Sequence, residues 1–146
     1  MSTRGVIARF TSPDRTKWEG RYHHWDSYPA GLGAELFNRY QDTRDLPAMV
    51  AHLIDSVDEW STIINKEDSR GDGTEALLTQ EDASSVGCEW AYAFDEDHSL
   101  VIMSSYRPDG EKMIGMFGMG DTEAVWREVA RVPFNEPAPN WETLGS

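Results

Sequence analysis

The segment richest in chemically useful side chains runs from Tyr22 to Gly33. It places two adjacent histidines, an aspartate and several aromatic rings between the end of an expected strand and the start of an expected helix. Such a junction brings polar side chains close to unpaired helix N–H groups, which suits an anionic or small polar ligand. The candidate binding residues are Arg4, Arg21, Tyr22, His24, Trp25, Asp26, Tyr28, Gly31 and Gly33.

The same segment permits an enzymatic alternative. His23 or His24 would act as general acid or base, and Asp26 would orient the imidazole. Arg4 or Arg21 would hold an anionic substrate. Neighbouring residues on a strand face opposite sides, so the two histidines do not hold one metal together, and we expect neither a metal nor a cofactor. We give more weight to a structural role, in which the aromatic rings fill the junction and Asp26 accepts backbone hydrogen bonds in a turn.

The residues His24-Trp25-Asp26-Ser27-Tyr28-Pro29-Ala30-Gly31, with Thr3-Arg4-Gly5 before them and Glu89-Trp90-Ala91-Tyr92 after them, carry a resemblance. The chain resembles a family of small uncharacterised bacterial and phage proteins that have a His-Trp-Asp-Gly-Tyr-Pro segment ahead of a helix. Ser27 stands where that family has Gly. The resemblance covers residues 1–40 well and the rest loosely, and it implies a bacterial or phage origin without implying a reaction.

Charge is the outlying feature of the composition. The 146 residues include 26 Asp and Glu against 13 Lys and Arg, a formal net charge of −13. Direct nucleic-acid binding is disfavoured, because such binding relies on attraction to phosphates. A further alternative is an acidic DNA mimic, whose carboxylates occupy a DNA-binding cleft. The competing interpretation is that the charge maintains solubility.

The cysteine content and the hydropathy of the chain indicate the cellular compartment in which we expect it. The single Cys88 excludes an intramolecular disulfide, and no signal-like segment begins the chain. No apolar run approaches the roughly 20 residues that cross a bilayer. We expect a cytoplasmic protein, in the host cytoplasm if a phage encodes it, with no membrane partner. The oligomeric state does not follow from the sequence.

The leading hypothesis is a non-catalytic phage or bacterial accessory protein that binds a protein partner or a small ligand. An inhibitor of a host defence system fits that description. The hypothesis depends on the lack of a visible nucleophile–base pair or complete set of metal ligands in the sequence.

The pattern of elements predicts one α+β domain over residues 1–146. We expect a single antiparallel sheet, made by a hairpin over 3–25 and a three-stranded meander over 88–117, with helices packed on one face. A flexible loop is expected at about 66–87 and an extended C-terminal tail at about 133–146. The expected helices are Ala34–Tyr40, Leu46–Trp60 and Glu123–Arg131.

Two details of the expected helices concern charged side chains. Glu35 and Arg39 are four residues apart, which places them in reach of an ion pair. His52 falls opposite the apolar stripe of its helix, so we expect it at the surface.

Overall fold

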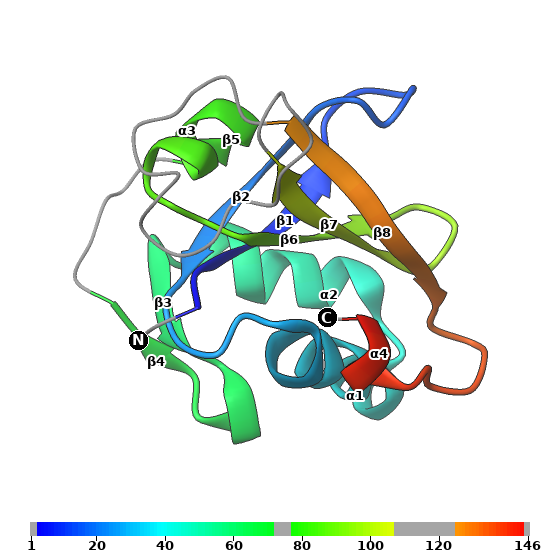
Figure 1. Ribbon diagram of the computed structural model, residues 1–146. Coiled ribbons are helices and arrows are strands. Elements are labelled where there is room, and N and C mark those ends of the chain that lie inside the picture. The colour runs from blue at the N-terminus through cyan, green and yellow to red at the C-terminus, as the bar shows by residue number, and fades with distance from the viewer. Residues whose placement is uncertain (1–2, 72–76, 107–124, 145–146) are drawn as a thin grey trace.

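The computed structural model describes residues 3–71, 77–106 and 125–144. Over these residues eight strands form one sheet (Figure 1). The strands are β1 (Gly5–Phe10), β2 (Trp18–His23), β3 (Glu59–Thr62), β4 (Ser69–Arg70), β5 (Leu78–Thr79), β6 (Trp90–Asp95), β7 (Ser99–Tyr106) and β8 (Val125–Pro133). Their order is β4-β3-β2-β1-β6-β7-β8, and β5 pairs with β2.

The predicted hairpin is confirmed, but the single antiparallel sheet is wrong. β1 and β2 pair antiparallel, with Gly5 opposite His23 and Phe10 opposite Trp18. β6 then pairs parallel with β1, and β3 pairs parallel with β2. The sheet is therefore mixed, with β1 in its interior between β2 and β6. The prediction joined the hairpin and the meander in one antiparallel sheet, whereas the pairing that joins β6 to β1 is parallel.

Both faces of the sheet are covered, so the prediction of helices on one face is also wrong. One face packs against the helical turn η1 (Pro29–Gly33), α1 (Ala34–Thr43), α2 (Leu46–Val50), the turn η2 (Ala51–Asp55) and α4 (Trp141–Leu144). The other face packs against α3 (Gln80–Ser85). Figure 1 shows these groups on opposite sides of the sheet. Every residue of β6 is buried, as expected for an interior strand covered on both faces.

The predicted helix Leu46–Trp60 ends early. Asp45 caps α2 by accepting from the Ala48 amide at 3.1 Å, and the helix continues as η2 to Asp55. Trp60 lies in β3, and its indole N–H donates to the Leu53 carbonyl at 2.9 Å. Val57 and Trp60 are both buried in the same core as Leu53. Their spacing therefore matched a helical stripe although the chain changes direction between them.

The predicted flexible loop 66–87 contains regular structure. β4, β5 and α3 lie inside it, and Thr79 with Asp82 forms a capping box at the start of α3. The expected strand at 113–117 lies outside the described residues.

The helix predicted over Glu123–Arg131 is a strand where it is described. β8 pairs antiparallel with β7, and a register shift lies between Ile102 and Met103. Trp126 packs edge-on against Trp18, with ring centroids 5.2 Å apart. Valines at 125, 129 and 132 fit a helical stripe, but β-branched residues also favour strands, and pairing with β7 decides between the two.

The predicted tail packs on the domain. Phe134 is fully buried and stacks on Tyr40, with centroids 4.4 Å apart. Trp141 and Leu144 of α4 lie against the same core. Across the described ranges 3–71, 77–106 and 125–144, no helix is long and apolar enough to cross a membrane.

Leu53 tests the packing of η2 on the sheet. We expect Leu53→Asp to lower the free energy of unfolding by at least about 3 kcal/mol, because a carboxylate would replace a fully buried side chain. Ala51→Asp places the same charge on an exposed position of the same turn and is expected to change stability by less than about 1 kcal/mol. Urea denaturation of both variants measures the difference, and equal stabilities would contradict the packing.

Candidate functional site

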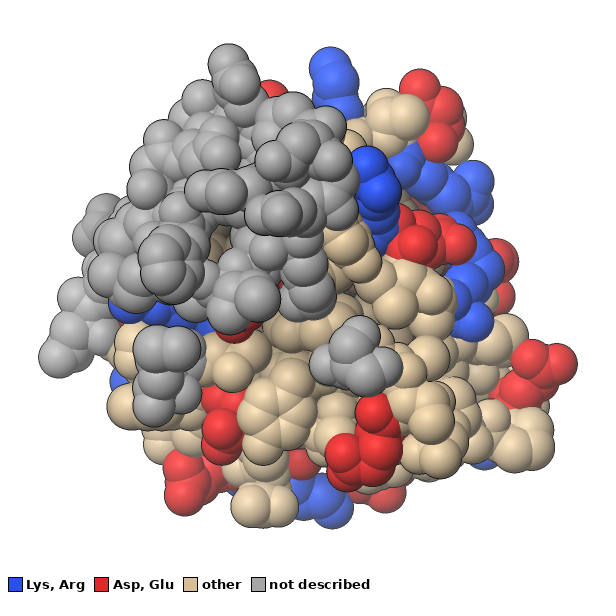
Figure 2. Space-filling model, in the orientation of Figure 1, with Lys and Arg blue, Asp and Glu red and all other residues tan. Residues whose placement is uncertain are grey.

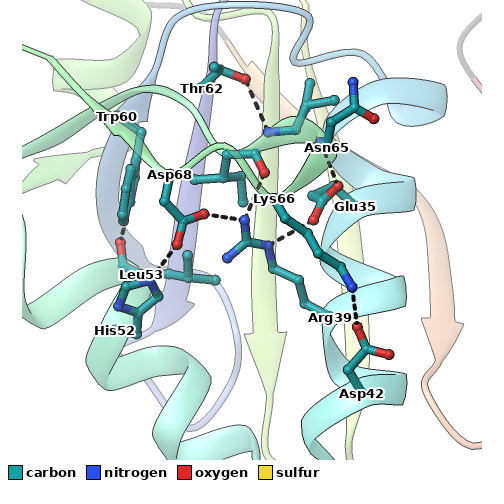
Figure 3. A network of polar contacts seen from close by, with 12 residues as sticks. Glu35, Arg39, Asp42, His52, Leu53, Trp60, Thr62, Asn65, Lys66 and Asp68 are labelled. Carbon is teal, nitrogen blue, oxygen red and sulfur yellow. Dashed lines mark hydrogen bonds and ion pairs between the residues drawn. The ribbon is translucent and has the colours of Figure 1, made fainter.

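A cavity of about 340 Å³ lies between α1, the α2–η2 helix and the segment that follows β3. Its lining combines apolar side chains with charged groups of both signs. The lining residues are Arg39, Asp42, Thr43, Ala48, Met49, His52, Leu53, Lys66 and Asp68. Figure 3 shows the charged members converging from the two helices and from the chain segment η3 (Ile64–Lys66) and beyond.

Arg39 makes several hydrogen bonds with other residues around the cavity. Its Nε donates to Glu35 at 2.9 Å, which confirms the predicted i,i+4 pair. Its Nη2 donates to the Ile63 carbonyl at 2.7 Å and to Asp68. Burial opposes the charge, but the hydrogen bonds to Asp68 and Glu35 outweigh it and hold the pKa of Arg39 above its ordinary value. The guanidinium is therefore a fixed, permanent positive charge.

One nitrogen of Arg39 is left for a ligand. Within the described residues, Nη1 has no hydrogen-bond partner, whereas Nε and Nη2 both have partners. In Figure 3 this third nitrogen points toward Leu53, which lines the same cavity. The Arg39 side chain is only 13% exposed, but Nη1 is not a buried atom, so its two remaining N–H donors lie where solvent or a ligand can reach them. An anionic group that enters the cavity can therefore replace water at these donors through charge-assisted hydrogen bonds.

Asp68 joins Arg39 to His52. One carboxylate oxygen accepts from Arg39, and the other lies 3.0 Å from His52 Nε2. Burial favours the neutral acid, but the hydrogen bonds to Arg39 and His52 outweigh this effect and hold the pKa of Asp68 below its usual range. Asp68 is thus an anion with both oxygens engaged. In the described part of the chain no group of three His, Cys, Asp or Glu side chains is placed to hold a metal.

The segment that carries Lys66 and Asp68 has a strained backbone. Asn65, Lys66 and Asp68 have φ values of 58°, 60° and 50°. This left-handed region costs residues other than glycine on the order of 1 kcal/mol each. The Asn65 amide donates to Glu35 at 2.9 Å, and Arg39 holds the Ile63 carbonyl, so α1 holds the segment in this conformation. Strain that neighbouring groups impose at a cavity wall is a feature of binding sites.

Lys66 and Asp42 form an exposed pair at the rim. Lys66 Nζ lies 3.0 Å from Asp42 Oδ2, and the two side chains are 71% and 58% exposed. Figure 3 shows the lysine reaching from the strained segment to the carboxylate on α1. An ion pair as exposed as this contributes little to stability, so its members can exchange partners at low cost.

Comparison with protein-family models, curated proteins and solved structures gave no match. The resemblance to bacterial and phage proteins therefore stays a prediction from the residues quoted for it.

The predicted binding residues divide between the two faces of the sheet. Arg4, Tyr22 and His24 lie on the α3 side, where Arg4 Nη1 donates to the Val86 carbonyl at 2.8 Å. The Tyr22 hydroxyl lies 2.7 Å from His24 Nδ1, and burial raises the pKa of Tyr22 to about 12. Arg4 and Tyr22 border a shallow depression of about 180 Å³.

Arg21 and His23 lie on the opposite face. Arg21 Nε donates to the Ile54 carbonyl at 2.7 Å. His23 is fully buried: its Nε2 accepts from the Ile63 amide at 3.1 Å, and its Nδ1 lies 2.9 Å from the Ser27 hydroxyl. Since an amide only donates, Nε2 carries no proton and Nδ1 donates to Ser27. Burial lowers the pKa of His23 to about 3. A neutral imidazole with both nitrogens engaged is a structural group.

Three predicted residues remain at the surface beyond β2. Trp25 is 47% exposed and Tyr28 is 40% exposed. Asp26 lies between them with a φ of 56°, and its carbonyl accepts from the Leu32 amide at 3.2 Å. Among the described residues, the Asp26 carboxylate contacts neither His23 nor His24. The predicted dyad of a histidine oriented by Asp26 is therefore not assembled in this structure.

The two predicted glycines serve packing. A Cβ on Gly31 would meet the Asp26 carbonyl oxygen at 2.3 Å. A Cβ on Gly33 would approach the rings of Trp141 and Tyr92 at 3.2 Å. Both positions let η1 lie close to its neighbours.

Sequence reasoning missed the cavity residues. It placed His52 at the surface, which agrees with its half-exposed position, and it paired Arg39 with Glu35. It did not connect Asp68 with Arg39, because the two residues are 29 positions apart in the chain. Three charged residues within Lys66–Asp68 after a predicted core segment were the available hint.

The acidic surface is mixed with basic groups where it can be seen. In Figure 2, Lys and Arg lie beside Asp and Glu over β8 and the β1–β2 turn. Two of the arginines of these elements, Arg15 and Arg131, donate to the buried Asp95 at 2.5 Å and 2.7 Å. An unbroken carboxylate array of the kind a DNA mimic needs is not present on this part of the surface.

His23 predicts a pH dependence of stability. The pKa is about 3 in the folded chain and about 6.5 when unfolded, so the unfolded chain binds the extra proton between these values. Stability from this group is complete above pH 6.5 and is lost as the pH falls toward 3. We expect a loss of about 2 kcal/mol between pH 8 and pH 5.

The matched variant is His23→Gln, which keeps an acceptor for the Ile63 amide and cannot titrate. Urea denaturation at both pH values should show a loss smaller by about 2 kcal/mol in the variant, although its stability at pH 8 is lower. A native His23 ring that titrates above pH 5 by NMR would contradict the burial argument.

Proposed function

We propose that this protein binds a small molecule that carries a singly charged anionic group, such as a carboxylate, on an apolar body. The observation that carries the proposal is the nearly buried Arg39, whose Nη1 donors face the cavity without a protein partner among the described residues. Arginine N–H groups recognise carboxylates through charge-assisted hydrogen bonds. The remaining contacts of Arg39 fix the direction in which these donors point.

The cavity suits a small ligand in size and lining. Its volume of about 340 Å³ falls in the range of about 300–1,000 Å³ that small-molecule sites occupy. Ala48, Met49 and Leu53 supply apolar contact for the body of the ligand. Asp42 and Asp68 would repel a group with two negative charges, which favours a carboxylate over a phosphate.

The proposal keeps the non-catalytic hypothesis and narrows it to a small ligand. We place the protein in the cytoplasm, an inference supported by one unpaired, buried cysteine. Burial raises the pKa of the Cys88 thiol well above its ordinary value, which favours an inert side chain.

The proposal is tested with 3-phenylpropionate, which has one carboxylate and one apolar ring. We expect it to bind more tightly than the uncharged 3-phenylpropan-1-ol, because Arg39 supplies a positive charge and N–H donors that have no partner among the described residues. Ala48→Phe should abolish binding by filling the cavity. Ala51→Phe adds the same ring to an exposed position that does not line the cavity and should leave binding unchanged. Ligand-observed NMR measures both compounds.

The variant Arg39→Lys provides a second test of the same proposal. Lysine keeps the charge but has no fork of donors, so we expect weaker binding of the acid and a smaller preference over the alcohol. Thermal denaturation of each variant shows that it is folded. Binding that survives Ala48→Phe, or equal binding of acid and alcohol to the wild type, would sink the proposal.

A second candidate function is protein binding at the surface formed by Trp25, Asp26 and Tyr28. Two large aromatic side chains are exposed there, and Trp and Tyr are enriched among residues that dominate protein interfaces. The net charge of −13 favours a basic partner.

Trp25→Ser separates this candidate from a structural role. Because Trp25 is nearly half exposed, we expect the melting temperature to change little, while recovery of a specific partner from a bacterial lysate is lost. The same partner recovered equally by the wild type and the variant would exclude the surface.

A further inference from the structure

We propose that the ligand of the cavity is zwitterionic, an α-amino acid with an apolar side chain. This inference rests on the proposed function and adds a second contact, between the ligand's ammonium group and Asp42. Its basis is the balance of charges in the lining and the hydrogen-bonding capacity that the protein leaves unused.

The permanent charges in the lining cancel. Arg39 and Lys66 contribute two positive charges, and Asp42 and Asp68 contribute two negative charges. In a lining with balanced charges, a simple anion gains attraction only from its direct contact with Arg39, and the carboxylates offset part of it. A molecule that carries both charges can contact a group of each sign. His52, the remaining titratable group of the lining, is engaged through Nε2 with Asp68.

One carboxylate and one cation of the lining keep hydrogen-bonding capacity for a ligand. Asp68 has partners on both carboxylate oxygens, so it has little left for a ligand. Among the residues that the structure describes, Asp42 has one partner, Lys66, which meets it in the exposed pair at the rim. Arg39 offers Nη1. The described part of the lining therefore presents one available anion and one available set of cationic donors.

The helix places these two groups together. Arg39 and Asp42 are three residues apart on α1, and residues with that spacing lie on one face with Cβ atoms about 5–6 Å apart. A compact head group with a carboxylate beside an ammonium can span such neighbours. Its side chain would lie against Met49 and Leu53.

The exchange at the rim is inexpensive. The Lys66–Asp42 pair is largely exposed, and such pairs contribute little. When the ligand's ammonium takes the place of Lys66 on Asp42, the lysine becomes available for the ligand's carboxylate beside Arg39. Each charge that loses a partner gains another, so the lining stays neutralised.

The test compares phenylalanine with 3-phenylpropionate, which differ by the ammonium group alone. Titrations at pH 7.5, followed by NMR, give the two dissociation constants. We expect phenylalanine to bind about fivefold more tightly to the wild type, from one charge-assisted hydrogen bond at a partly exposed site. Asp42→Asn should remove this preference and leave 3-phenylpropionate binding intact or stronger.

Asp58→Asn is the matched control, because Asp58 is exposed and does not line the cavity. It should leave both constants unchanged. Equal binding of the two acids to the wild type, or a preference that survives Asp42→Asn, overturns the zwitterion and leaves the anion proposal standing. If neither acid binds better than 3-phenylpropan-1-ol, the proposed function fails, and this inference fails with it.

Discussion

The two hydrogen bonds of the Ile63 backbone hold the parts of the site in register. Its N–H donates to buried His23 at the end of β2, and its C=O accepts from Arg39 on α1. The chain after β3 is thus fixed to the sheet on one side and to the helix on the other. His23 can accept this hydrogen bond only while its imidazole is neutral. Burial of the ring favours the neutral form, so it helps to maintain the connection. Ser27 extends the same connection, since its carbonyl accepts from the Tyr92 hydroxyl at 2.5 Å.

The fixed position of Ile63 explains the strained backbone of the segment that follows it. Ile63 is fully buried, and the residues after it must turn back to reach β4, which they do through left-handed conformations at Asn65, Lys66 and Asp68. Glu35 stabilises that turn by accepting from the Asn65 amide. The same glutamate orients Arg39. One side chain therefore fixes both the wall of the cavity and the cation inside it, which accounts for the close packing of charges around a largely buried arginine.

Sequence patterns predicted correctly the features that depend on contacts between residues close together in the chain. The turn residues of the hairpin, the apolar stripe of α1 and the Glu35–Arg39 pair all follow from spacings of a few residues. The parallel pairing of β6 with β1 depends on contacts about 85 residues apart, and nothing in the strand itself distinguishes it from an antiparallel one. The spacing of Trp60 and of the valines of β8 fits both a helix and a strand. Pairing with β2 and with β7 determines that these residues lie in strands. The cavity was missed for the same reason, because Asp68 and His52 meet only after the chain folds.

The excess negative charge of the chain bears on what this cavity can attract. A net charge of −13 repels anions at long range, although salt screens that field within about 8 Å at physiological ionic strength. A simple anion must therefore approach against the overall field and gain its attraction only at Arg39. A zwitterion has no net charge and meets no such barrier, yet it still presents a carboxylate once it enters. The global charge and the balanced local charges of the lining thus favour the same class of ligand, on independent grounds.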